Sequence, residues 1–332
     1  MTVGTDSSML RMSIVIGTLN RCEMLTRSLN SIERQTCDPR WLEIIVVDNG
    51  STDRTSAIVA EFATRMANLR YVLESTKGLS TARNRGIAEA RAELVAFMDD
   101  DGEAEPNWAE TVLRVFMEEP NTDAVGGPVL VRWPNEQNRR PDWMSDSLLG
   151  YYGGCYYGPV RRPLSFPEYP FGPNMVIRRD RLNQIHGFDS RLGPTGENLM
   201  VGGETDMFYR LHQLSPKVIY EPSAIVHHWT TTRRMTRTWC LKRAFTHGIS
   251  IARMQFSNDN RARAHWLRRA VLGVWRMAIS AFSTSVGWIT RAKPAIVMSR
   301  CATTVYWTGN VRGAVANLVA TRITPSLPAQ EQ

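Results

Sequence analysis

The sequence predicts an α/β fold in which helices flank a mostly parallel sheet, with a basic helical extension after it. Short apolar stretches alternate with amphipathic helical stretches through the first hundred residues, which is the pattern of a parallel sheet. Beyond residue 230 the strand pattern stops and helical periodicity replaces it. Lys and Arg outnumber Asp and Glu by 16 to 2 from residue 231 onward, against 24 to 30 before it.

The expected strands and helices follow one another at short intervals. In chain order we expect a strand at 13–18, a helix at 23–35, a strand at 43–47, a helix through 58–62, a strand at 71–74, a helix at 80–90 and a strand at 94–98. Polar clusters follow three of these strands, at 18–21, 48–51 and 99–101. Ligands of such sheets bind outside the carboxyl ends of the strands, so we expect the three clusters to meet in one crevice.

Two further regions have a distinct character. Residues 131–173 are crowded with Pro, Gly and aromatic residues, which predicts a long ordered loop or a small subsheet. Helical patterns run through 239–256 and 265–289.

The three consecutive aspartates at 99–101 are the strongest single feature. Carboxylates this close repel one another, and a hard divalent cation such as Mg²⁺ would offset that repulsion. The alternative is a solvated acidic turn that caps the following helix at Asn107.

A second acidic pair, Glu204 and Asp206, stands before an apparent helix. Near a cleft, such a pair fits a general base whose pKa its neighbours tune. The alternative is a helix N-terminus, where acidic residues are favoured by the helix dipole.

Two adjacent histidines, His227 and His228, end the last apolar stretch of the sheet pattern. A histidine there is either packed into the structure or, close to a cation site, a metal ligand.

Seven segments, in order, resemble the family 2 glycosyltransferases with a GT-A fold, over residues 12 to about 250. They are SIVIGTLNR at 13–21, IVVDNGSTDRT at 45–55, GLSTARNRG at 78–86, VAFMDDD at 95–101, PNMVIR at 173–178, GFD at 187–189 and GGETD at 202–206. The resemblance implies a GT-A type, Rossmann-like sheet and an inverting, nucleotide-sugar dependent transferase. It also implies a divalent cation, Mn²⁺ or Mg²⁺, as cofactor.

The resemblance implies a role for each cluster. The metal ligands are Asp101 and His228, with His227 the less favoured histidine. The base is Glu204, which stands where the family usually has Asp, with Asp206 as the second choice. The residues expected to bind the nucleotide sugar are Thr18, Asn20, Arg21, Asp48, Lys77, Arg83, Asp99, Asp100 and Arg234, with Arg237 an alternative to the last of these.

These interpretations divide the chain into a tail at 1–11, a catalytic domain at 12–230, a basic amphipathic helical region at 231–322 and a tail at 323–332. The donor half of the catalytic domain is 12–130. Its other half, 131–230, holds the base and, through its aromatic residues, the acceptor, unless those aromatics only pack on the core.

The basic region predicts contact with an anionic membrane surface, because helices rich in Trp and Arg lie in the membrane interface. Residues 270–289 are interrupted by Arg276 and several serines, so we expect them to fall short of a transmembrane helix. The alternative is a helical subdomain packed on the catalytic core or on a partner. Nucleic acid is not an expected partner, because no recognition motif accompanies the charge.

The five scattered cysteines and the absence of an apolar leader predict free thiols and a cytoplasmic protein, peripheral on the inner face of the cell membrane. We expect a UDP-sugar first among donors, and a saccharide or lipid-linked glycan as acceptor, as in bacterial surface polysaccharide or glycolipid synthesis. The competing classes are a catalytically silent sugar-binding protein of the same fold and a nucleotidyltransferase.

Overall fold

The computed structural model describes residues 10–194, 201–257, 263–289 and 292–320. The chain forms two compact units, which we describe separately. The first, the catalytic unit, comprises Met1–Arg139, Tyr152–Asn198 and Gly203–Thr231, and the second, the helical unit, comprises Arg140–Tyr151, Leu199–Gly202 and Thr232–Gln332.

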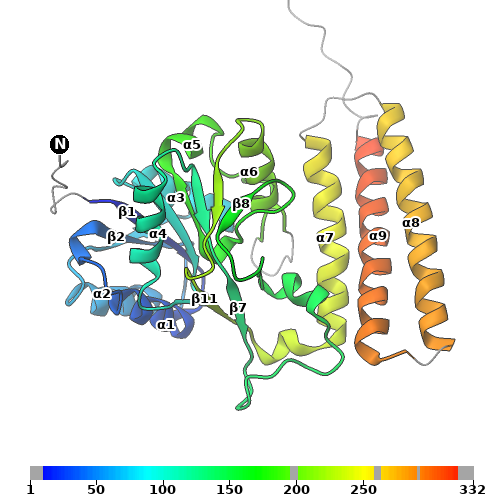
Figure 1. Cartoon of the computed structure of the whole chain (residues 1–332), viewed down its shortest axis with the longest axis horizontal. Helices are drawn as coiled ribbons and strands as arrows, with labels where there is room; N and C mark the ends of the chain where they lie inside the picture. The colour runs from blue at the N-terminus through cyan, green and yellow to red at the C-terminus, as the bar shows by residue number, and fades with distance from the viewer. Residues whose placement is uncertain (1–9, 195–200, 258–262, 290–291, 321–332) are drawn as a thin grey trace, which may run out of the picture. The chain divides into compact units, whose positions relative to one another are not determined.

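A mixed, mostly parallel sheet forms the centre of the catalytic unit (Figure 1). Within the described residues its strands are β1 (Met12–Thr18), β2 (Leu42–Asp48), β3 (Leu69–Leu73), β4 (Leu94–Asp99), β6 (Ala124–Gly126), β8 (Arg162–Leu164), β9 (Met175–Arg178) and β10 (Val218–Tyr220). Their order is β3-β2-β1-β4-β9-β6-β10-β8. The first four strands are parallel, as expected, and β9 runs antiparallel to both of its neighbours.

Helices cover both faces of this sheet, because successive residues of a strand point to opposite faces. On one face Ile14 and Ile16 pack with residues of α1 (Cys22–Glu33), α2 (Thr55–Ala63) and α4 (Trp108–Glu118). On the other face Val15 packs with residues of α3 (Leu79–Glu89), α5 (Arg179–Gln184) and α6 (Gly203–His212). The apolar runs that predicted these strands are therefore buried on both sides. Short 3-10 turns lie at Pro39–Trp41, Asp146–Tyr152, Gly172–Asn174 and Thr232–Met235.

A second, three-stranded sheet has the order β5-β11-β7, with β5 at Gly102–Ala104, β7 at Val129–Arg132 and β11 at Val226–Trp229. Strand β11 carries both His227 and His228. The predicted strand that carries the histidine pair is therefore present, and it pairs with β5 and β7 in the smaller sheet.

The aromatic segment 131–173 is ordered, as predicted, and joins the two sheets. It leaves β7 of the small sheet and, within the catalytic unit, contributes β8 at the edge of the main sheet. Between these strands it has little regular structure.

The helical unit contains α7 (Arg237–Ser257), α8 (Arg263–Ile289) and α9 (Pro294–Ala320), with α9 between the other two (Figure 1). The helical periodicity predicted α7 and α8 within two residues of their observed ends. Helix α9 lies in the region 231–322 that was expected to be helical, but its bounds were not predicted. Helices α7 and α9 pack backbone to backbone at glycines. A Cβ on Gly248 would lie 2.0 Å from the Tyr306 carbonyl oxygen, and one on Gly309 would lie 2.1 Å from the Phe245 carbonyl oxygen.

Helix α8 has a broad exposed apolar surface. Its exposed large apolar side chains are Val271, Leu272, Val274, Trp275, Ile279, Phe282, Val286 and Trp288. The stretch Ala270–Trp288 has a mean hydropathy of 1.2 and is only 17% buried. By length and composition alone it is sufficient to cross a membrane, so the expectation that it falls short is revised.

Candidate active site

Three parallel strands bring their polar ends to one edge of the main sheet. Thr18 at the end of β1 is paired in register with Asp48 at the end of β2, and Gly17 is paired with Asp99 at the end of β4. The clusters that the sequence places after these strands do therefore meet.

Asp99, Asp101 and His228 form a group that could hold a metal ion. One ligand atom from each lies within 4.8 Å of those of the other two, and His228 Nε2 is 3.0 Å from Asp101 Oδ1. His227, the neighbouring residue on β11, instead places its Nε2 2.6 Å from Glu105 Oε1. Two carboxylates and one imidazole fit a divalent transition metal such as Mn²⁺ better than Mg²⁺, which prefers oxygen ligands alone.

Asp100, between two members of this group in the chain, is buried. It accepts hydrogen bonds from the Thr18 hydroxyl at 2.8 Å and from Arg21 at 2.5 Å, and Arg21 also donates to Asp101 at 2.6 Å. Burial raises the pKa of Asp100 to about 7, an effect that Arg21 opposes and Asp101 reinforces. Asp100 and Asp101 are 4% and 3% exposed, so the aspartates do not form a solvated turn. Asn107 precedes α4 without a side-chain capping bond.

Asp48 and Asn20 shape the loops beside the metal group. Asp48 accepts from the Ser51 backbone at 2.7 Å and from the Tyr71 hydroxyl at 2.8 Å. Burial, together with this bond, raises the pKa of Tyr71 to about 12. Asn20 has a left-handed backbone, φ 53°, and accepts from the Thr52 backbone at 2.7 Å. Tyr71 was expected only as a strand residue, and its contact with Asp48 was not predicted.

Lys77 and Arg234 each contact other parts of their own unit. Lys77 Nζ donates to the carbonyl oxygens of Asn49 and Gly50, at 2.8 and 2.9 Å, so it braces the loop after β2. Arg234 belongs to the helical unit, where its guanidinium lies 5.8 Å from the centre of the Trp239 ring.

Arg83 joins the candidate base to the metal group. Its guanidinium donates to Glu204 at 2.7 Å and to Asp99 at 2.9 Å. The Arg83 side chain is 4% exposed, whereas those of Glu204 and Asp99 are 25% and 24% exposed. Burial alone would lower the pKa of Arg83, but the two carboxylates outweigh it and raise that pKa. Arg83 is therefore charged and holds both carboxylates in place.

Gly172 forms the wall beside this arginine, a contact that the sequence did not reveal. A Cβ at this position would lie 2.5 Å from Glu204 Oε1 and 2.7 Å from Arg83 Nη2. The backbone can approach the pair this closely only because residue 172 has no side chain.

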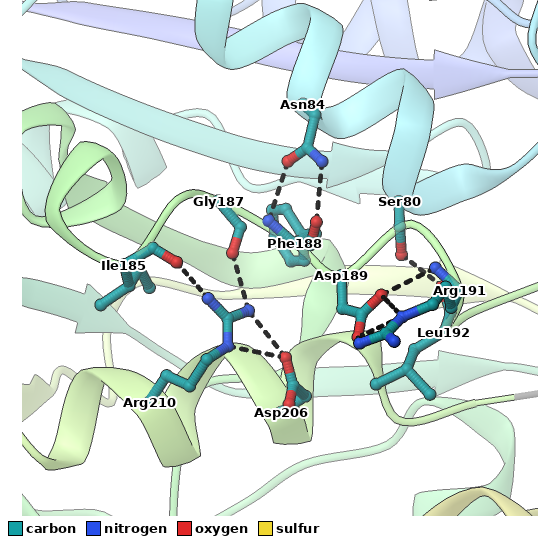
Figure 2. A network of polar contacts seen from close by, with 10 residues as sticks. All are labelled: Ser80, Asn84, Ile185, Gly187, Phe188, Asp189, Arg191, Leu192, Asp206 and Arg210. Atoms are coloured by element: carbon teal, nitrogen blue, oxygen red, sulfur yellow. Dashed lines mark hydrogen bonds and ion pairs between the residues drawn. The ribbon is translucent and has the colours of Figure 1, made fainter. Parts of the chain in front are cut away.

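Asp206, the second choice for the base, belongs to a network of polar contacts that holds neighbouring segments together (Figure 2). Its carboxylate is 2% exposed and bonds Arg210, which also donates to the carbonyl oxygens of Ile185 and Gly187. Both acids stand in the first turn of α6, as the helix-terminus interpretation expected. The Glu204 side chain is 25% exposed and that of Asp206 only 2%, so Glu204 is the more accessible of the two acids.

Other motif residues hold elements together. Figure 2 shows Asn84 of α3 bonded to both the backbone nitrogen and the carbonyl of Phe188, each at 2.8 Å. Ser80 donates to the Leu192 carbonyl at 2.6 Å. These contacts tie α3 to the GFD segment that precedes α6.

Most aromatic residues of the segment 131–173 pack on the core. Trp133 and Tyr152 are buried, and the Tyr169 ring stacks on Phe208 at 5.2 Å. The Tyr169 hydroxyl is 2.6 Å from Thr205 Oγ1, directly after Glu204. Tyr156 is 62% exposed and is available to a ligand.

An α/β sheet with charged side chains at its carboxyl edge is the arrangement of enzymes that bind nucleotides. The sequence profile of glycosyl transferase family 2 matches residues 13–185, which is more than half of the chain. The chain therefore belongs to this family and is a glycosyltransferase with a GT-A type fold.

Several curated proteins are similar to this chain. A glucosyl-dolichyl phosphate glucuronosyltransferase of Haloferax volcanii is 26% identical over 244 residues, 73% of this chain and 76% of that protein. Glycosyltransferase AglE of the same organism is 33% identical over 200 residues, 60% of this chain and 62% of AglE. A pre-mycofactocin glycosyltransferase of Mycobacterium tuberculosis is 26% identical over 292 residues, 87% of this chain and 56% of that protein. The alignments thus span less than two thirds of the latter two relatives.

Two solved structures share the fold. Mannosyltransferase PcManGT from Pyrobaculum calidifontis, in complex with GDP-Man and Mn²⁺, matches with a TM-score of 0.56 and 17% identity, over 99% of this chain and 80% of its own. GalNAc-T7 with UDP, GalNAc and Mn²⁺ matches with a TM-score of 0.52 and 18% identity, over 68% of this chain and 44% of its own.

Proposed function

We propose that the protein is an inverting glycosyltransferase that moves a sugar from a nucleotide diphosphate donor, a UDP-sugar first, to a hydroxyl of a saccharide or lipid-linked glycan. The observation that supports this proposal is that the Arg83 guanidinium bonds both Glu204 and Asp99, and so holds the Glu204 carboxylate beside the metal group. A base and a site for the leaving diphosphate are then neighbours at one sheet edge. The alternative, a catalytically silent sugar-binding protein, would not require this pairing.

The chemistry follows from the residues. Glu204 takes the proton of the acceptor hydroxyl while the hydroxyl oxygen attacks the anomeric carbon of the donor sugar. Asp99, Asp101 and His228 would hold a divalent cation, which supplies a Lewis acid for the charge on the leaving diphosphate. Arg83 fixes the Glu204 carboxylate on the attacking side. A single displacement with no covalent intermediate inverts the anomeric configuration.

The acceptor and the location are further parts of the proposal. The relative from Haloferax volcanii is named for action on glucosyl-dolichyl phosphate, a lipid-linked sugar. The exposed apolar surface of α8 and the 16 to 2 excess of basic residues after 230 suit the surface of an anionic membrane. We therefore propose a lipid-linked acceptor and a cytoplasmic enzyme at the inner face of the membrane.

The donor site is tested by calorimetry with UDP-, GDP- and dTDP-sugars, with and without Mn²⁺. We expect metal-dependent binding of one nucleotide class, weakened at least tenfold in Asp101→Ala. Asp38→Ala is the matched control, because Asp38 pairs with Arg40 on the exposed surface, outside this site. Failure of every nucleotide to bind in the presence of Mn²⁺ would reject the donor proposal.

The base is tested with Glu204→Gln, which keeps the shape of the side chain and removes its basicity. We expect turnover to slow by roughly a hundredfold to ten-thousandfold, with little change in donor affinity. NMR of the product gives the anomeric configuration. A retained configuration, or wild-type turnover in Glu204→Gln, would reject this mechanism, and metal-dependent donor binding without turnover would favour the silent binding protein.

A further inference from the structure

A second pocket lies against the small sheet of the catalytic unit. It has a volume of about 740 Å³, within the range of ligand sites in proteins. Arg27 of α1, Glu103 of β5, His227 of β11 and the loop that follows β7 contribute to its walls. Successive residues of a strand point to opposite faces, so His227 faces this pocket while the next residue, His228, belongs to the metal group.

The walls combine aromatic rings with hydrogen-bonding groups of both kinds. Two indoles, Trp133 and Trp229, line the pocket. The charged lining is balanced, with the arginines Arg27, Arg34 and Arg132 and the glutamates Glu103, Glu105 and Glu136. Asn135 and Asn138 add amides, which both donate and accept.

The polar groups are already oriented by one another. Glu103 accepts from the Trp229 indole at 2.8 Å, and the Arg27 guanidinium lies 4.8 Å from the centre of the same ring. Glu105 and Arg132 approach His227 Nε2 at 2.6 and 3.2 Å. These contacts restrict the rotamers of the lining, so a ligand would meet a largely preformed surface.

We propose that this pocket is a second saccharide-binding site, separate from the donor site, which takes neutral sugar residues. The flat carbon face of a sugar packs on the partly exposed Trp229 indole, since Trp133 is buried, while carboxylates and guanidinium groups bond the hydroxyls of the sugar. The balanced charge disfavours a phosphate or another strong anion, since the pocket holds as many carboxylates as guanidinium groups. The density of charged groups likewise disfavours an apolar chain.

Together with the proposed function, this site would hold sugars of the acceptor that do not react. The pocket and the metal group are built on the same elements: α1 directly follows Arg21, β5 directly follows Asp101, and β11 carries both histidines. Binding in the pocket does not require the donor chemistry, so the two proposals can fail independently.

The test is saturation-transfer NMR of the full chain with tetrasaccharides of glucose, mannose, galactose and N-acetylglucosamine, without any nucleotide. We expect at least one to bind the wild type, and to bind at least tenfold more weakly to Arg27→Ala and Glu105→Gln. Arg65→Ala is the matched control, since Arg65 covers the Phe62 ring outside the pocket. Thermal unfolding of each variant checks that the fold is kept.

A variant of the metal group separates the two sites. Asp101→Ala should bind the tetrasaccharide as the wild type does, even where it loses the nucleotide. The inference is overturned if none of the four sugars binds. It is also overturned if Asp101→Ala abolishes binding, or if Arg27→Ala and Glu105→Gln both leave the affinity unchanged. Failure of every nucleotide to bind the wild type in the presence of Mn²⁺, with intact sugar binding, would reject the donor proposal alone.

Discussion

Replacing Gly172 with alanine should displace the proposed base without unfolding the protein. The added Cβ would lie 2.5 Å from Glu204 Oε1, whereas ordinary contact begins at 3.4 Å, so the carboxylate must move by about 0.9 Å. The two close neighbours, Glu204 Oε1 and Arg83 Nη2 at 2.7 Å, are both ends of side chains, so the added Cβ meets no backbone atom there. A misplacement of about 1 Å at a reacting group lowers the rate about a hundredfold, which is about 2.7 kcal/mol of activation free energy.

The measurement is steady-state kinetics of Gly172→Ala with the donor and acceptor that the binding experiments identify. We expect turnover to slow about a hundredfold while the KM for the donor changes less than threefold. Gly158→Ala is the control, because a Cβ on residue 158 would meet nothing within 4 Å. The φ of +102° at this residue strains an alanine, so this variant should lose stability but keep the wild-type turnover. Wild-type turnover in Gly172→Ala would refute the assigned position of the base.

Three other predictions concern stability and location. Arg210→Met should lower the free energy of unfolding by about 3 kcal/mol in urea titrations, because it leaves the buried Asp206 carboxylate without its arginine; a loss below about 1 kcal/mol would contradict this. Burial alone would raise the pKa of Glu221, but the Ser223 backbone and Arg161 outweigh burial and lower that pKa. Glu221 therefore stabilises the fold fully above its ordinary pKa of 4.5, and this stabilisation is lost as the pH falls below that value. Glu221→Gln should therefore differ most from the wild type at neutral pH, and a gap that widens in acid would be inconsistent with this. Phe282→Glu on the exposed face of α8 should reduce flotation with anionic vesicles, while Thr303→Glu should not.

The sheet edge could be predicted because two local signals agreed there. Buried parallel strands are continuous runs of Val, Ile and Leu, such as Ile44 to Val47, and the polar clusters directly follow such runs. The rule that ligands bind at the carboxyl ends of strands then brought Thr18, Asp48 and Asp99 together. Each step needs only neighbours in the chain and one general property of the fold.

Contacts between distant segments were not predictable in this way. The antiparallel insertion of β9 between β4 and β6 depends on pairing between segments far apart in the chain, which no local pattern records. Gly172 gave no signal because its importance comes from Glu204 and Arg83, which reach it from other elements. By contrast, the pairing of Asp206 with Arg210 was visible as an i, i+4 spacing on a helix, and it could have ranked the two candidate bases beforehand.

The adjacent histidines make the length of the segment before β11 a functional quantity. His228 faces the metal group and His227 faces the second pocket, because successive side chains of a strand point to opposite faces of the sheet. Deletion of one residue between Glu221 and Val226 that shifts β11 by one position would place His228 where His227 now stands, and Trp229 where His228 now stands. Such a one-residue register shift would remove a metal ligand and alter the pocket at the same time, although every side chain of both sites would still be present in the sequence. Among homologues, we therefore expect single-residue length changes to be rarer in this short segment than substitutions.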